Sequence, residues 1–137
     1  MRVKKMKKFD INDDLGLEKR QPDTAMNITS IVLGQEVSTI AAEAETEGYG
    51  RVYLTYHLSY DANRQGGTVD VQGRAFLTDD SASGRSQGFW EMVDGIIVMR
   101  NVTSVQLIRS GVQHINLDII QFNPLTRTAV IKAYILK

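Results

Sequence analysis

The sequence predicts an all-β protein, an antiparallel up-and-down barrel of about seven or eight strands with a short N-terminal arm. From residue 50 to residue 136, apolar side chains recur at every second position, which is the period of a half-buried strand. Turn signals interrupt this pattern about every 10–15 residues. The chain has 137 residues, a length that suits one domain with its own core.

The arm is expected at residues 1–23 and the barrel domain at residues 24–137. The first segment is densely charged, contains few apolar residues and ends in Gln21-Pro22-Asp23. Chain termini of this kind are commonly poorly ordered, so we expect little more than one short strand near residues 7–11.

Two structures are compatible with the start of the barrel domain. Residues 28–33 have the composition of a strand, and Gly34 follows them. Residues 35–47 fit a helix through the spacing of Val37, Ile40 and Ala44, but they also alternate with period two. We favour a strand and leave the helix open.

The strands that follow are expected at residues 50–60, 68–78, 86–93, 96–107, 112–122 and 126–136. The connections between them are expected at Gly66-Gly67, residues 79–84, Asp94-Gly95, Ser110-Gly111 and Asn123-Pro124. Asp94-Gly95 is the strongest short hairpin signal in the chain, because both residues tolerate the positive φ of a two-residue turn. Long strands with short connections favour a closed barrel over a sandwich, since closure removes exposed edges.

Composition excludes several classes of protein. The absence of cysteine rules out disulfides, a thiol nucleophile and cysteine-ligated metals. The balanced charge, 16 basic against 16 acidic residues, gives no reason to expect a nucleic-acid partner. No run approaches the ~20 apolar residues that span a bilayer, and the basic start has no apolar run behind it, so we expect a cytoplasmic protein without a membrane partner.

No phosphate-binding, nucleophile-elbow or zinc-protease motif is present, and we expect no cofactor. His114, Asn116 and Asp118 share one face of a predicted strand, and His57 or Asp70 from a neighbouring strand is a possible third metal ligand. A polar outer face wetted by solvent explains the same residues better, so we predict no metal site.

Carboxylates offer a similar choice. Asp70 and Arg74 project from one strand face, with Glu91 and Asp94 on the next strand. A buried carboxylate near an arginine can transfer protons, but ion pairs on a wet surface are the simpler interpretation.

Aromatic residues point to a cavity or to a filled core. An eight-stranded barrel has room for packed side chains or for one small ligand. Of the aromatic residues, Tyr56 and Trp90 are the predicted ligand-binding residues. A cavity of ~300 Å³ or more would favour ligand binding. The aromatic residues considered for its wall are Tyr53, Tyr56, Tyr60, Phe76, Phe89, Trp90, Phe122 and Tyr134.

The glycine pattern of residues 46–100 resembles the allene oxide cyclase-like barrels, in particular their small uncharacterised bacterial members. The residues that carry the resemblance are 48–56, Gly66-Gly67, Gly73, 84–89 and Asp94-Gly95. The resemblance implies an eight-stranded antiparallel barrel that often forms oligomers. It carries over no catalytic residue, and the C-terminal third departs from the expected glycine-rich ending.

Three functions are compatible with these observations: a barrel that binds a small apolar ligand, an isomerase- or cyclase-type enzyme, and a filled barrel with a structural or interaction role. We also expect a homo-oligomer, because three C-terminal segments are apolar on both strand faces and outward apolar side chains need a cover. These segments are residues 96–99, residues 119–120, and residues 130–131 with 134–136 in the final strand.

Overall fold

The computed structural model describes residues 18–136, and all of its regular elements in that range are strands. The strand expected near residues 7–11 lies outside the described residues. The strands are β1 (Glu18–Lys19), β2 (Thr24–Val32), β3 (Val37–Thr46), β4 (Gly50–Ser59), β5 (Gly66–Phe76), β6 (Ser81–Val93), β7 (Ile96–Leu107), β8 (Gln113–Asn123) and β9 (Thr128–Ile135).

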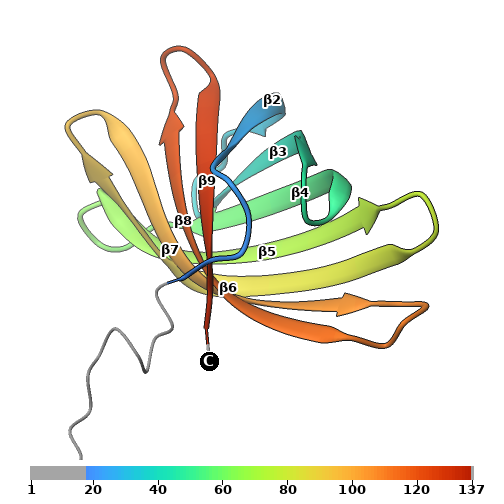
Figure 1. Cartoon of the computed structure of the whole chain (residues 1–137). Coiled ribbons are helices and arrows are strands. Elements are labelled where there is room, and N and C mark those ends of the chain that lie inside the picture. Colours follow the sequence, from blue (N-terminus) through green and yellow to red (C-terminus); the bar gives the residue numbers. More distant parts are fainter. Residues whose placement is uncertain (1–17, 137) are drawn as a thin grey trace, which may run out of the picture.

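Eight of these strands close into an antiparallel up-and-down barrel, which confirms the predicted fold class. Each strand from β2 to β8 pairs with the next one, and β9 pairs with both β8 and β2 to close the ring. The hairpins follow one another around the barrel (Figure 1). Among the described residues no helix is long and apolar enough to cross a membrane.

The ambiguous segment after Gly34 is a strand, as favoured, and the helix alternative is wrong. Ser38, Ile40, Ala42 and Ala44 of β3 are buried in strict alternation with more exposed neighbours. The segment pairs along its whole length with β4. Alanine and glutamate favour a helix by intrinsic propensity. Burial of one complete face of the strand in the barrel outweighs this preference.

The Asp94-Gly95 hairpin is confirmed, with φ of 51° and 81° at the two residues. Gly66-Gly67 is not a turn; the two residues begin β5. A Cβ atom on Gly67 would lie 1.8 Å from the carbonyl oxygen of Ser59, so this glycine permits a close approach of two strands. The loop expected at residues 79–84 is also shorter, because residues 81–84 already pair with β5.

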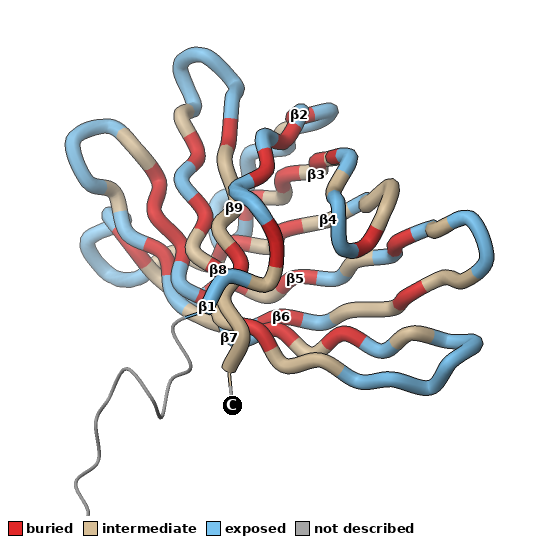
Figure 2. The backbone as a smooth tube through the Cα atoms, in the orientation of Figure 1, coloured by how far each residue is buried: buried red, intermediate tan, exposed pale blue. Residues whose placement is uncertain are grey.

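The barrel interior contains one large and one small apolar cluster. Buried residues alternate with more exposed ones along the strands (Figure 2). The large cluster includes Trp90, Met99, Ile120 and Phe122. The small cluster lies towards the opposite end of the strands, and its buried members are Tyr49, Ala75, Ala82 and Val105. Of the aromatic residues considered for a cavity, Tyr53, Phe76 and Phe89 are exposed on the outer surface, at 46%, 53% and 70%. Their placement inside was wrong, because their strand positions face outward.

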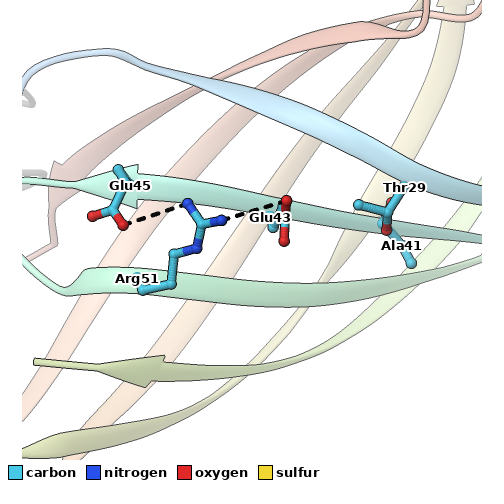
Figure 3. A network of polar contacts seen from close by, with 5 residues as sticks. All are labelled: Thr29, Ala41, Glu43, Glu45 and Arg51. Carbon is cyan, nitrogen blue, oxygen red and sulfur yellow. Dashed lines mark hydrogen bonds and ion pairs between the residues drawn. The ribbon is translucent and has the colours of Figure 1, made fainter.

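The outer surface carries polar contacts of the ordinary kind. Arg51 of β4 reaches across to Glu43 and Glu45 of β3, at 3.5 and 3.4 Å (Figure 3). The Thr29 hydroxyl donates to the carbonyl oxygen of Ala41 at 3.2 Å. Exposed ion pairs of this kind contribute little to stability.

The described end of the predicted arm packs against the barrel. Glu18 and Lys19 pair with Ile135 and Tyr134 of β9. Gln21 is buried, and its side-chain oxygen accepts a hydrogen bond from the backbone N–H of Gly48 at 2.9 Å. Residues 18–23 therefore help to cover one end of the barrel.

Candidate functional site

Strand β8 reverses the usual distribution of polar and apolar residues over part of its length. His114, Asn116 and Asp118 face the barrel interior, and Asn116 and Asp118 are only 2% and 7% exposed. Their neighbours Ile115 and Leu117 face outward. The interpretation of this polar row as a wet outer face is wrong, because the register with β7 and β9 turns it inward.

Asn116 and Asp118 of this row line a cavity of about 80 Å³, whose wall includes residues of both apolar clusters. Small residues on four strands, among them Ala44, Gly73, Gly84 and Ala133, leave this space open. The cavity is smaller than the ~300 Å³ of an ordinary ligand pocket. It is roughly half of the ~150 Å³ that accommodates benzene in an engineered protein cavity, so it has room for a group of a few non-hydrogen atoms.

Asp118 is the one acidic residue in the described cavity wall. One of its oxygens, Oδ2, lies 2.6 Å from the hydroxyl of Thr103, which is itself 2.8 Å from the hydroxyl of Ser86. A hydroxyl has a single hydrogen, so when Thr103 donates to the carboxylate, Ser86 donates to Thr103. The other oxygen, Oδ1, has no hydrogen-bond partner among the described residues. Burial raises the pKa of Asp118 from 3.8 to about 6, against the opposing effect of the Thr103 hydrogen bond.

Asn101 is the second unpaired group. It is 1% exposed, lies opposite Asp118 in the β7–β8 register and lines the same cavity. Neither its side-chain oxygen nor its nitrogen has a partner within the described chain. The absence of a side chain at Gly88 makes room for it, since a Cβ there would lie 2.4 Å from Asn101 Oδ1. Buried amides are rarely left without partners, so this group is available to a bound molecule.

A chain of hydrogen bonds runs along the covered end of the cavity. Arg20 donates to Asn116 at 2.8 Å, and Asn116 donates to the hydroxyl of Tyr49 at 2.9 Å. Tyr49 lies 2.9 Å from Nδ1 of His114. Since the Tyr49 oxygen accepts from Asn116, its own hydrogen is free for the His114 ring, which then carries no proton on Nδ1.

The pKa shifts of His114 and Tyr49 agree with this direction of the hydrogen bonds. Burial, with a smaller effect from Arg20, lowers the pKa of His114 and favours the neutral ring that can accept a hydrogen bond. Burial also raises the pKa of Tyr49, which keeps the phenol protonated as a donor.

The two predicted ligand-binding residues lie in different places. Tyr56 is 2% exposed and belongs to the cavity wall; its hydroxyl contacts the sulfur of Met26 at 3.5 Å, and burial raises its pKa. Trp90 lies outside this wall. Its indole N–H donates to the carbonyl oxygen of Ser59 at 2.8 Å, and its ring meets Tyr60 edge-on.

The other candidate groups do not converge on the cavity. His57 and Asp70 lie opposite each other in the β4–β5 register and belong to the outward rows of these strands, away from the inward row of β8. No hydrogen bond joins their side chains in the described structure, and Asp70 Oδ1 is buried without a partner there. Arg74 donates to Ser83 on the exposed side, and Glu91 forms an exposed ion pair with Arg100 at 3.7 Å. Over residues 18–136, no group of three or more histidine or carboxylate side chains is placed to hold a metal ion.

Sequence reasoning missed several residues of the site. Asn101 and Thr103 occupy inward positions of β7 between the apolar Met99 and Val105. Two polar residues that interrupt the inward row of a strand are a signal that the sequence contains. Tyr49 and Arg20 gave no such signal, since each reaches the site through contacts distant in sequence.

Comparison of the chain with protein-family models, with curated proteins and with solved structures finds no match. The resemblance of residues 46–100 to the allene oxide cyclase-like barrels stays a prediction.

Proposed function

We propose that the protein binds a small molecule in the cavity of its barrel. The observation that carries the proposal is the pair of buried, unpaired polar groups in the cavity wall, Asp118 Oδ1 and the amide of Asn101. A buried polar atom without a partner costs about 1–3 kcal/mol, and a bound molecule that supplies the partner recovers this free energy.

The rest of the wall sets the character of the ligand. Apolar side chains, among them Leu54, Val71, Ile120 and Ile131, surround the two polar groups. This supports a ligand with a short apolar part, as expected from the sequence, and adds a head group that forms hydrogen bonds. The 80 Å³ volume limits the enclosed part to about four non-hydrogen atoms.

The test is a titration with four probes of similar size: propylammonium, propionamide, 1-propanol and propionate. Binding is followed by backbone amide chemical shifts, because fragments of this size bind at concentrations on the order of millimolar. We expect at least one probe to shift amides of the cavity strands in a saturable manner.

Gly84→Val is the variant that closes the cavity. An added Cβ at Gly84 meets nothing closer than 3.5 Å, so the larger side chain enters the cavity without a clash at its base. Ser83→Val is the matched control, since its side chain projects from the opposite face of β6. Saturable binding that Gly84→Val removes and Ser83→Val retains supports the proposal; binding that neither variant changes, or no binding of any probe, overturns it.

A homo-oligomer is the second candidate, and the outward side of β8 supports it. Val102, Leu117 and Tyr134 form one cross-strand row on the outer face of β7, β8 and β9, and Val102 is 51% exposed. A second copy of the chain is the proposed cover, because closed symmetric assemblies of identical chains are the commonest oligomers. Such an interface needs about 800 Å² per subunit.

Light scattering coupled to size exclusion tests this candidate. We expect a mass above 15.3 kDa for the wild type and a shift to the monomer in Leu117→Glu. Phe89→Glu, at an exposed site on β6, should keep the wild-type mass. A wild-type monomer at micromolar concentration would rule the oligomer out.

A further inference from the structure

We propose that the head group bound by the cavity is a primary ammonium, held by the free oxygen of Asp118 and by the amide of Asn101. This inference rests on the proposed function and names the class of ligand for the same site. It depends on the charge of the wall and on the hydrogen-bonding capacity of the two unpaired groups.

Asp118 is a buried acid with no positively charged partner among the described residues. Its carboxylate is 7% exposed, and no described cation lies in hydrogen-bond contact with it. Arg74 and Arg85 border the cavity, but both belong to the outward rows of β5 and β6. Arg20 lies at the covered end, where its Nε binds Asn116. A buried carboxylate without a paired cation favours a positively charged ligand.

The unpaired groups of the cavity wall need a ligand with several hydrogen-bond donors. The free Oδ1 of Asp118 only accepts when the carboxyl is ionised. The amide of Asn101 presents its oxygen or its nitrogen to the cavity after a half-turn about its last torsion. The hydroxyl oxygen of Tyr56, in the same wall, is a third acceptor. An ammonium group has three donors and no acceptor, so it can satisfy three such oxygens at once.

Other head groups match this wall less well. A carboxylate would place a second negative charge beside Asp118. A hydroxyl has a single donor, and a neutral amide has two donors but no charge to compensate the carboxylate. The apolar walls then accept a chain of two or three carbons behind the ammonium, within the 80 Å³ available.

Binding of an ammonium should weaken in acid. Protonation of Asp118, whose pKa burial raises to about 6, removes the charge that attracts the ligand. The other titratable or charged groups near this region are Tyr49, Tyr56, His114 and Arg20, together with Arg74 and Arg85 at its border, which stay charged throughout. The two phenols stay neutral and Arg20 stays charged over this range, whereas protonation of His114 adds a positive charge that acts in the same direction. The variant Asp118→Asn separates the two effects, because it retains His114.

The experiment uses the same four probes on the wild type and on Asp118→Asn at pH 7.5, and repeats the wild-type titration at pH 5. We expect propylammonium to bind the wild type at least tenfold more tightly than 1-propanol. Asp118→Asn should weaken propylammonium at least tenfold and leave 1-propanol within twofold. Lowering the pH to 5 should weaken propylammonium in the wild type about fivefold or more.

The failures of the two proposals can be told apart. If 1-propanol, propionamide or propionate binds as tightly as propylammonium, or Asp118→Asn leaves the preference unchanged, the ammonium assignment is overturned while ligand binding stands. If no probe binds the wild type saturably, the cavity holds only water and both proposals are wrong. The stability of Asp118→Asn, treated below, shows whether this variant is folded.

Discussion

Replacing Asp118 with asparagine should stabilise the folded protein at neutral pH and change its stability little in acid. The carboxyl group is buried, and its ionised form is held by a hydroxyl contact rather than by a cation. Asparagine has nearly the same shape and can still accept from Thr103, but it carries no charge that must be desolvated.

The size and sign of the effect follow from the pKa of Asp118. Burial raises this pKa from 3.8 to about 6, so the folded state retains a proton that the unfolded chain has released. The group therefore contributes stability below about pH 3.8, and this contribution is lost as the pH rises to about 6. At 1.36 kcal/mol per pKa unit the full change is about 3 kcal/mol, most of it between pH 4 and pH 7.

The assay is urea denaturation of both proteins at several pH values between 4 and 7.5. Asp118→Asn should gain about 2–3 kcal/mol over the wild type across this range, or roughly 10 °C in Tm for a domain of this size. The titration of His114 occurs in both proteins and cancels in the difference. Asp79→Asn, the same substitution at an exposed position, is the control and should change the free energy of unfolding by no more than about 0.5 kcal/mol. A constant difference for Asp118→Asn, or a loss of stability at pH 7, would refute the reasoning.

Three further predictions concern packing, the hydrogen-bond chain and the fold. In urea denaturation, Gly88→Ala should cost about 2 kcal/mol or more, because its Cβ would lie 2.0 Å from the carbonyl oxygen of Arg100. Gly84→Ala, with no contact under 3.5 Å, should stay within about 0.5 kcal/mol, and equal costs for the two would contradict the packing described. Tyr49→Phe removes a hydroxyl that both accepts and donates a hydrogen bond, and should lower the free energy of unfolding by about 1 kcal/mol in the same assay. An unchanged denaturation midpoint would argue against the hydrogen-bond chain through Tyr49. Far-UV circular dichroism should be dominated by β-structure, and a third or more helix would be incompatible with the barrel.

The order of the strands could be predicted because most of their buried residues fall at alternate positions; β7 departs from this at Val98, which is buried between Ile97 and Met99. Ile96–Leu107 was predicted with the bounds that β7 has, since a hairpin signal and a turn signal flank it. Gly66-Gly67 was mistaken for a turn because glycine serves close strand approach as well as turns, and composition alone does not separate the two. The strand register, which decides the close approach, depends on pairings that a local pattern does not specify.

The candidate site was harder to predict than the fold. Tyr56 was selected correctly as a residue of the interior, because it lies within a strongly alternating strand. Asp118 was assigned to the outer face, because polar residues face water in most strands. Arg20 was assigned to the N-terminal arm, outside the barrel domain, since no local apolar pattern indicates that the segment before Thr24 docks on the barrel.

The two halves of β8 favour opposite registers: the second half has its largest apolar residues in the row that carries polar residues in the first half. Ile120 and Phe122, at 1% and 2% exposed, fill the large apolar cluster. A register slip of one residue would turn both of them outward, and burying a side chain of this size is worth about 1.5–3 kcal/mol. The same slip would bring Ile115 and Leu117 inside, where residues with small side chains leave a cavity of only about 80 Å³. The observed register therefore keeps Ile120 and Phe122 buried, and as a consequence it places Asn116 and Asp118 in the interior. This register has two consequences: buried polar groups inside the barrel that lack partners in the described chain, and apolar side chains on its outer face. A bound head group would supply partners for the first, and a second copy of the chain would cover the second.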